Sequence, residues 1–265
     1  MSYEPIVSII IPLYNSQSDI IDCLKSILKQ TYDKYEIIII DDGSTDNSVV
    51  LVAEFINEHP EIQFKFFQQD NSGPSKARNM GILNSTGELI AFIDSDDEWR
   101  PNKLESIVRV FEDKEIVLAS SLYSIGYNEI FKNVDDSIRV ISVNKLLFKN
   151  FFITSGVVCR ASVLQNYKFC ETQRYSEDYR LWLDICSGGY KCVLLNSSLV
   201  RMNSKPMYGS KGLSSRLYEM EKGELYNFVY LLGLKKINIF QYVCATVVSI
   251  AKYVCRMIKV GLRKI

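Results

Sequence analysis

Hydrophobic residues alternate between two patterns over residues 1–120. Short β-branched runs, such as Val-Ser-Ile-Ile-Ile at 7–11, lack polar alternation, as is typical of parallel strands covered on both faces. Each run leads through a turn into a stretch with helical periodicity. The pattern predicts strands at 7–11, 36–40, 63–67, 88–93 and 116–119, with helices at 20–29, 48–57, 74–83 and 101–111. Such a βαβ series predicts an open, mostly parallel α/β sheet flanked by helices, with a ligand crevice beyond the carboxyl ends of its strands.

After residue 120 the elements become shorter. The sequence predicts strands at 122–125 and 138–141 and helices at 144–149, 162–166 and 178–186. We expect one domain over residues 1–224, with a nucleotide half at 1–120 and a half at 121–224 that holds a second substrate. Residues 225–265 form a tail of different composition.

Charge divides the 265 residues unevenly, although 31 Lys and Arg balance 31 Asp and Glu to a formal net charge of +0. No acid follows Glu224, whereas seven basic residues do, so residues 1–224 carry a charge of −7 and the tail +7. The neutral total gives no sign of a nucleic-acid partner.

The tail predicts an amphipathic helix. Lys252, Arg256, Lys259 and Arg263 follow at spacings of 4, 3 and 4, which places them on one face, opposite Val247, Val254, Ile258 and Leu262. Residues 237–251 carry no charge but fall short of the roughly 20 residues that cross a bilayer. We expect residues 237–265 to lie on an anionic membrane surface. The alternative is a helix that packs on its own domain or on a dimer partner.

The rare residue types exclude several kinds of site. His59 is the single histidine, which excludes histidine triads and HExxH zinc sites. Seven cysteines form an odd set without a CxxC pair, which favours reduced thiols in a cytosol-facing protein. No basic segment precedes the first apolar run, so a secretory signal is not expected.

An acidic cluster, Asp94-Ser95-Asp96-Asp97, follows the fourth predicted strand. Two carboxylates two residues apart can both reach Mg²⁺ or Mn²⁺, which prefer oxygen ligands. The alternative is that these acids complement the dipole of the helix that follows Pro101.

Two further polar clusters border the predicted crevice. The first is Asp41-Asp42-Gly43-Ser44-Thr45-Asp46, in which Gly43 permits a tight turn and Ser44 or Asp46 is expected to cap the next helix. Turn and cap do not explain the adjacent carboxylates of Asp41 and Asp42, which we expect to bind the sugar or base of a nucleotide. In Asn71 to Gly81, Arg78 lies where a phosphate or a base edge can bind. Lys76 is equally explained as a solvated surface charge.

A fourth cluster, Ser176-Glu177-Asp178, begins an amphipathic helix. Ser176 is predicted to cap this helix, and the two acids suit its first turn whether or not they have a function. Their order along the chain favours a second interpretation, in which an isolated carboxylate serves as a general base.

Taken together, the chain resembles the family 2 glycosyltransferases of the GT-A fold over about the first 200 residues. The motifs that carry this resemblance are Val-Ser-Ile-Ile-Ile-Pro-Leu-Tyr-Asn at 7–15, Asp-Asp-Gly-Ser-Thr-Asp at 41–46, the Asn71 to Gly81 segment, Asp94-Ser95-Asp96-Asp97 and Glu177-Asp178.

The resemblance implies a role for each of the matching residues. Nucleotide contacts fall to Pro12, Tyr14, Asn15, Asp41, Arg78, Asp94 and Ser95, with Tyr14 near the base, Asp41 at the base edge and Asp94 near the ribose. Asp96 binds Mn²⁺ or Mg²⁺, Asp178 is the catalytic base, and Glu177 supports Asp178 or contacts the acceptor. Lys205, Lys211 and Arg216 are candidates for closing on the diphosphate.

The resemblance also implies an inverting transferase with a nucleotide-sugar donor, most often UDP-linked. Its acceptor is a glycan or polyprenyl-diphosphate-linked saccharide at the inner face of the cytoplasmic membrane. Two alternatives stay open: a non-catalytic, membrane-associated nucleotide-sugar-binding protein, and an aspartate-based phosphatase or receiver domain, for which residues 118–121 provide no lysine. The sugar, the linkage and the oligomeric state are left open.

Overall fold

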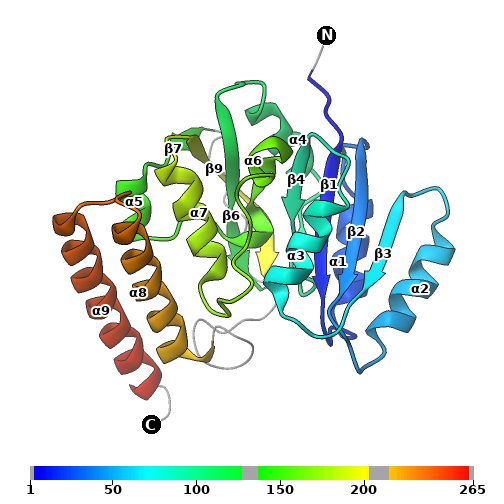
Figure 1. Ribbon diagram of the computed structural model, residues 1–265. Helices are drawn as coiled ribbons and strands as arrows, with labels where there is room; N and C mark the ends of the chain where they lie inside the picture. The colour runs from blue at the N-terminus through cyan, green and yellow to red at the C-terminus, as the bar shows by residue number, and fades with distance from the viewer. Residues whose placement is uncertain (1–2, 127–136, 203–214, 263–265) are drawn as a thin grey trace.

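A computed structural model describes residues 3–126, 137–202 and 215–262. Within these residues, nine strands form one mixed sheet with helices on both faces (Figure 1). Eight of the strands follow the order β3-β2-β1-β4-β8-β6-β9-β5, and β7 pairs with β9. The predicted α/β class with a sheet flanked by helices is confirmed; the mostly parallel pairing expected for the sheet holds from β1 to β4, whereas β5, β7 and β8 pair antiparallel.

The first half contains β1 (Val7–Leu13), α1 (Ile20–Leu28), β2 (Tyr35–Asp41), α2 (Ser48–Glu58), β3 (Phe64–Gln68), α3 (Pro74–Leu83), β4 (Leu89–Phe92), β5 (Asp97–Trp99) and α4 (Lys103–Val110). The second half contains β6 (Ile116–Ile125), β7 (Ile138–Val140), α5 (Val143–Phe148), the 3-10 helix η1 (Thr154–Gly156), β8 (Val158–Arg160), α6 (Ala161–Leu164), α7 (Glu177–Ser187) and β9 (Lys191–Met202). Two helices, α8 (Leu217–Gly233) and α9 (Ile239–Leu262), end the described chain.

Strand direction separates the two halves of the sheet. β1 pairs in parallel with β2 and β4, and β2 pairs in parallel with β3, so their carboxyl ends meet at one edge. β8 lies antiparallel between β4 and β6, and β9 runs parallel to β6. The sequence did not predict β5, β8 or β9. The strands expected at 116–119 and 122–125 form the single strand β6.

Alternate residues of β1 enter two different cores. Ile9 and Ile11 belong to the core that includes residues of α1, α2 and α4 on one face, whereas Ile10 belongs to the core that includes residues of α6, α7 and α8 on the other. Burial on both faces explains why these strands lack polar alternation. Pro74 begins α3 as expected, but α4 begins only at Lys103, so Pro101 precedes the helix instead of occupying its first turn.

Helix α8 runs through the domain boundary predicted at residue 224 and lies side by side with α9 (Figure 1). Buried Glu221 of α8 accepts hydrogen bonds from Ser249 at 2.8 Å and from Arg256 at 2.9 Å. Lys252 donates to the carbonyl oxygen of Phe148. The side of α9 that carries these residues thus contacts protein.

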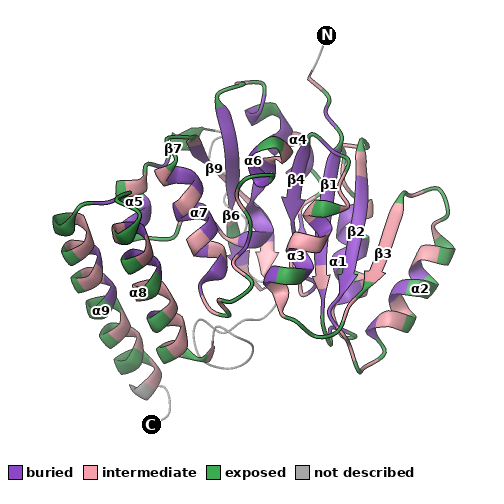
Figure 2. Cartoon of the chain, in the orientation of Figure 1, coloured by how far each residue is buried: buried purple, intermediate pink, exposed green. Residues whose placement is uncertain are grey.

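The opposite side of α9 is exposed, as Figure 2 shows along the outer edge of the molecule, and its large exposed side chains are apolar. The exposed large hydrophobic residues of α9 are Ile239, Phe240, Val243, Val247, Ile250, Val254, Met257 and Ile258. Arg263 and the side chain of Leu262 lie outside what the structure describes. In the described part of the chain, no helix combines the length and apolar character that crossing a bilayer needs.

Candidate active site

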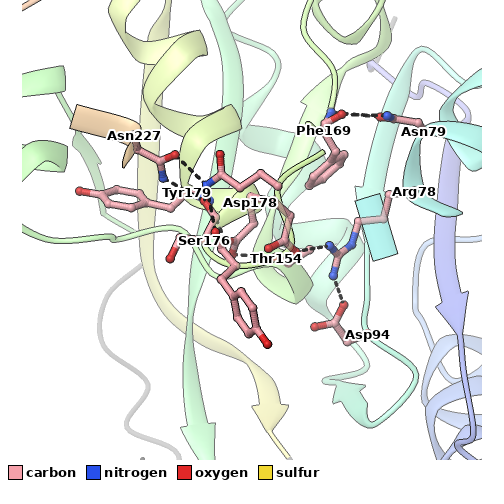
Figure 3. A network of polar contacts seen from close by, with 12 residues as sticks. Arg78, Asn79, Asp94, Thr154, Phe169, Ser176, Asp178, Tyr179 and Asn227 are labelled. Atoms are coloured by element: carbon pink, nitrogen blue, oxygen red, sulfur yellow. Dashed lines mark hydrogen bonds and ion pairs between the residues drawn. The ribbon is translucent and has the colours of Figure 1, made fainter. Parts of the chain in front are cut away.

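The candidate site lies where the parallel strands end. Tyr14 and Asn15 follow β1, Asp41 ends β2, and Asp94 follows β4. The parallel pairing of these strands brings the three segments to one edge, as expected from the sequence. The second half of the chain adds η1 and the start of α7 to the same region (Figure 3).

Arg78 joins the two halves of the site. Its Nη2 lies 2.8 Å from Asp94 Oδ1 and its Nη1 lies 3.1 Å from Glu177 Oε1. The guanidinium also lies 5.2 Å from the centre of the Phe169 ring. Arg78 is 5% exposed. Burial by itself lowers the pKa of Arg78, but the carboxylates of Asp94 and Glu177 outweigh it and raise the pKa, so Arg78 stays charged.

Glu177 and Asp178 form a pair of adjacent carboxyl groups at the start of α7. Burial, together with the negative charge of Asp178, raises the pKa of Glu177 to about 7, although Arg78 opposes this rise. Burial also raises the pKa of Asp178, again against Arg78. Asp178 Oδ2 accepts a hydrogen bond from Thr154 Oγ1 at 3.1 Å. Two carboxyl groups with raised pKa values suit proton transfer near neutral pH.

Ser176 does not cap α7, contrary to the sequence prediction. Its backbone is left-handed, with φ of 56°, and its hydroxyl donates to the carbonyl oxygen of Met220 at 3.0 Å. The hydroxyl therefore contacts α8 instead of the free N–H groups of α7.

Asp94, Asp96 and Asp97 form an acidic triad. One carboxylate oxygen from each lies within 4.8 Å of the others. Three hard oxygen donors at this separation fit the coordination of Mg²⁺ or Mn²⁺. Asp97 is a candidate ligand in addition to Asp96, the residue that the sequence assigned. Asp97 belongs to β5 and α4 begins only at Lys103, so the alternative role beside a helix N-terminus loses its basis.

Thr154 and Ser155 of η1 are site residues that the sequence analysis missed. Thr154 contacts Asp178, while Ser155 Oγ donates to Asp97 Oδ2 at 2.5 Å and accepts from the Asp94 backbone N–H at 3.1 Å. One short turn thus supports both the acidic triad and the Glu177–Asp178 pair. The signal for it was Thr-Ser-Gly between the apolar runs at 151–153 and 157–159.

The loops after β1 and β2 are joined by hydrogen bonds. The backbone N–H of Asn15 donates to Ser44 Oγ at 3.0 Å, and Asn15 Oδ1 accepts from the Thr45 N–H at 2.8 Å. Asp41 Oδ1 accepts from the Ser44 N–H at 3.1 Å. Next to these loops, Tyr14 is 50% exposed and Pro12 is partly buried, which leaves their surfaces open to a ligand.

Several polar residues near the site have contacts that hold the protein together. Buried Asp42 accepts from the N–H groups of Ser72 and Gly73, both at 2.8 Å, so it fixes the loop before α3. Ser95 and Ser16 hydroxyls lie 2.7 Å apart. Asp46 Oδ1 accepts from the Ser48 N–H at 2.9 Å, but the N-cap residue of α2 is Asn47, not Ser44 or Asp46 as predicted, and its side chain makes no capping hydrogen bond.

The remaining basic candidates lie elsewhere. Lys76 is exposed, which agrees with a solvated surface charge. Arg216 directly precedes α8 and is also exposed. Lys205 and Lys211 lie outside the described residues.

Relatives of known sequence cover most of the chain. The chain is 33% identical over 253 residues to WfgD of Escherichia coli, a UDP-Glc:alpha-D-GlcNAc-diphosphoundecaprenol beta-1,3-glucosyltransferase, covering 89% of this chain and 96% of that protein. It is 35% identical over 191 residues to an uncharacterized glycosyltransferase of Rickettsia conorii, covering 68% of this chain but only 30% of that protein. The chain thus spans about a third or less of several of its relatives.

Solved structures show the same fold at low sequence identity. A mannosyltransferase of Pyrobaculum calidifontis, in complex with GDP-Man and Mn²⁺, has a TM-score of 0.70 at 19% identity, over 94% of this chain and 74% of that one. Staphylococcus aureus TarS 1–349 in complex with UDP-GlcNAc has a TM-score of 0.67 at 19% identity, over 85% of this chain and 66% of that one. The GT-A fold implied by the resemblance is confirmed.

The family assignment rests on the first two thirds of the chain. The model of glycosyl transferase family 2 matches residues 8–171, which include the strand ends, Arg78, the acidic triad and η1. The chain belongs to glycosyl transferase family 2.

Proposed function

We propose that the protein is an inverting, metal-dependent glycosyltransferase that moves a sugar from a nucleoside diphosphate to a hydroxyl group of a saccharide acceptor. The observation that carries this proposal is the Arg78 bridge, with Asp94 on one side and Glu177 on the other. It supports the proposal because it brings the acidic triad and the Glu177–Asp178 pair into one site.

The donor side is built around Asp94, Asp96 and Asp97. These carboxylates would hold Mg²⁺ or Mn²⁺, which would stabilise the negative charge of a departing diphosphate. Ser155 fixes the triad by bonding Asp97 and the backbone of Asp94. We assign Pro12, Tyr14, Asn15, Asp41, Arg78, Asp94 and Ser95 to the nucleotide, on the basis of their placement around the ends of β1, β2 and β4.

The acceptor side is built around Asp178. A sugar hydroxyl is a poor nucleophile until a base takes its proton, and His59, the single histidine, lies beside Phe55 at the end of α2. Asp178 is our choice of base because Thr154 orients it, whereas Arg78 holds Glu177 in place. A base that acts opposite the leaving group gives single displacement, hence inversion at the anomeric carbon.

The substrates proposed here follow those in the name of WfgD, which matches nearly the whole chain. We infer a UDP-linked donor, with UDP-glucose as the first candidate. The acceptor class is a saccharide linked to a polyprenyl diphosphate, as in bacterial surface polysaccharide synthesis.

The exposed apolar side of α9 suits a lipid surface. An acceptor with a polyprenyl chain lies in a membrane. The exposed apolar side of α9 belongs to residues 225–265, which contain no acidic residue to repel anionic lipid. We propose that α9 docks on the inner face of the cytoplasmic membrane. Arg256 forms an ion pair with Glu221. We therefore expect other basic residues, such as the exposed Lys259, to attract anionic lipid.

The function is tested first by donor binding and then by transfer. Thermal unfolding is measured with UDP-, dTDP- and GDP-sugars, with and without Mn²⁺, because a bound donor stabilises the fold. Glucose transfer from UDP-glucose to alpha-D-GlcNAc-diphosphoundecaprenol follows. Metal-dependent binding with transfer supports the proposal. Binding without turnover of any acceptor would favour the non-catalytic alternative, and the absence of metal-dependent binding by any nucleotide would contradict the proposal.

Membrane docking is tested by vesicle sedimentation of the full chain. Replacing Val247, Val254 and Ile258 with glutamine should release the protein from vesicles that contain anionic lipid. The control replaces Val50 of α2 and Leu83 of α3, which are 55% and 80% exposed. Equal vesicle binding by both variants would contradict a docking role for α9.

A further inference from the structure

The turn before the Glu177–Asp178 pair has a backbone conformation that serine rarely adopts. Ser176 has φ of 56° and ψ of 28°, a left-handed conformation that costs a residue with a Cβ more than it costs glycine. Ser176 directly precedes α7, so its torsion angles set the direction in which the first turn of α7 begins. Such a conformation persists only where surrounding contacts stabilise it.

Asn227 of α8 provides those contacts. Its side chain is fully buried, and its Nδ2 donates to the carbonyl oxygen of Ser176 at 2.9 Å. Its Oδ1 accepts from Gln173 Nε2 at 2.8 Å, and the same amide of Gln173 lies 2.9 Å from the carbonyl oxygen of Tyr175. Figure 3 shows Asn227 and Asp178 close to the Ser176 turn.

The backbone of α8 also lies against this turn. A Cβ built on Gly223 would lie 2.3 Å from the carbonyl oxygen of Tyr175, so only glycine fits there without a shift. On the same helix, the carbonyl oxygen of Met220 accepts from Ser176 Oγ at 3.0 Å. Glu221, bound by Ser249 and Arg256, anchors α8 to α9. The Ser176 turn thus contacts α8, which is itself held by α9.

We propose that Asn227 is a positioning residue, which holds the Ser176 turn so that Asp178 faces the acceptor hydroxyl. This inference rests on the function proposed above for Asp178. It gives α8, which lies beyond the segment matched by the family model, a part in the reaction. Without the Asn227 donor, the carbonyl group of Ser176 keeps the hydrogen bonds from the Arg180 N–H at 3.1 Å and from Gln173 Nε2 at 3.3 Å but loses the shortest of the three, so the start of α7 is held less firmly.

Asn227→Asp tests this role most sharply. Aspartate keeps the shape and the acceptor for Gln173, but it turns a carboxylate toward the carbonyl oxygen of Ser176. We expect kcat for glucose transfer from UDP-glucose to fall about tenfold to a hundredfold, as for a misplaced catalytic group. KM for UDP-glucose should change less than about twofold, because the donor side is untouched.

Two further variants separate positioning from general stability. Leu231→Ala truncates a buried side chain on the same helix but removes no hydrogen-bonding group, so it should lower the melting temperature without lowering kcat in the cold. Ser176→Gly, added to Asn227→Asp, should restore part of kcat because glycine adopts the left-handed conformation readily. Asn227→Ser serves the same purpose as Asn227→Asp if the carboxylate prevents folding.

Hydrogen–deuterium exchange gives a readout that needs no substrate. Asn227→Asp should speed amide exchange in a peptide that covers residues 173–179, whereas Leu231→Ala at matched stability should not. Unchanged exchange in that peptide, or a kcat within about twofold of the wild type, would overturn the positioning role. Failure of the wild type to use any sugar nucleotide would instead contradict the proposed function, and the exchange data would still decide whether Asn227 holds the turn.

Discussion

Arg78 Nη1 lies 3.1 Å from Glu177 Oε1, although 99 positions separate the two residues. Arg78 comes from α3 in the parallel half of the sheet, and Glu177 begins α7 in the mixed half. The ion pair is buried, with side-chain exposures of 6% and 10%. The Arg78 guanidinium therefore helps to set the relative position of the two halves of the site, together with the hydrogen bonds of Thr154 and Ser155.

Removing the charge of Arg78 is expected to destabilise the fold. Arg78→Met leaves Asp94 and Glu177 without their shared partner, and breaking a buried ion pair in this way costs about 3–5 kcal/mol. Urea unfolding measures the change in the free energy of unfolding. Arg109→Met is the matched control, because Arg109 pairs with Glu105 on the exposed surface of α4 and should cost less than about 1 kcal/mol. Equal stability of the two variants would show that the bridge is not structurally important.

Transfer is expected to depend on pH through the Glu177–Asp178 pair. A general base must lose its proton first, and burial raises the pKa of Asp178, so kcat should rise with pH at a higher pH than for an ordinary aspartate. The groups that face the pair are Arg78, Thr154 and, through Arg78, Asp94. Glu177→Gln removes a neighbouring negative charge and should move the midpoint of kcat to lower pH. A midpoint that stays in place would count against coupling between the two carboxyl groups.

The same pair makes stability depend on pH in a defined direction. Because the pKa of Glu177 is raised from 4.5 to about 7, the folded protein keeps a proton that the unfolded chain loses. Its contribution to stability is complete below pH 4.5 and is lost as the pH rises toward 7. Urea unfolding of the wild type and of Glu177→Gln at pH 5 and pH 7.5 measures the change in the free energy of unfolding between the two pH values. The wild type should lose more stability than the variant; a loss of the same size in both would refute the assignment.

The hydrogen bond from Thr154 is expected to lower the pKa of Asp178. The Thr154 hydroxyl bonds the carboxylate and favours the charged form, so Thr154→Val should raise the pKa of Asp178 and shift the midpoint of kcat to higher pH. Thr154→Ser keeps the hydroxyl and should behave like the wild type. Identical pH profiles for valine and serine would rule out the hydrogen bond as a determinant.

Metal binding is expected to require Asp96. Isothermal titration of UDP in the presence of Mn²⁺ measures it without turnover. Asp96→Asn should weaken Mn²⁺-dependent binding by at least about tenfold, the lower end for disturbed metal sites. Asp70→Asn, an exposed acid in the loop before α3, is the control and should bind as the wild type does. EDTA should abolish binding in all three proteins.

The sequence predicted the parallel half of the sheet well because its signals are local. Buried runs such as those of β1 and β2 keep their character whatever packs on them, and polar residues at the ends of parallel strands must meet at one edge. The placement of Asp94 and Arg78 near each other follows from this rule. The order of the motifs then located Glu177 and Asp178.

The missed features depend on partners distant in the sequence. β5 and β8 have three residues each, and both are strands only because longer strands pair with them. The left-handed backbone of Ser176 depends on Asn227, 51 positions later, so a capping rule based on neighbours predicted the wrong contact. Ser155 and Thr154 belong to the site because they hydrogen-bond Asp97 of β5 and Asp178 of α7. No local sequence pattern connects these pairs.

The central claim is that Asp178 is the base of a metal-dependent sugar transfer. The most direct test compares glucose transfer from UDP-glucose to alpha-D-GlcNAc-diphosphoundecaprenol, with Mn²⁺ present, by the wild type and by Asp178→Asn. The substitution keeps the shape of the side chain but removes its basicity. We predict a kcat at least about a hundredfold lower for the variant, in the range for loss of a general base, with UDP binding unchanged. Transfer by Asp178→Asn at the rate of the wild type would contradict the claim.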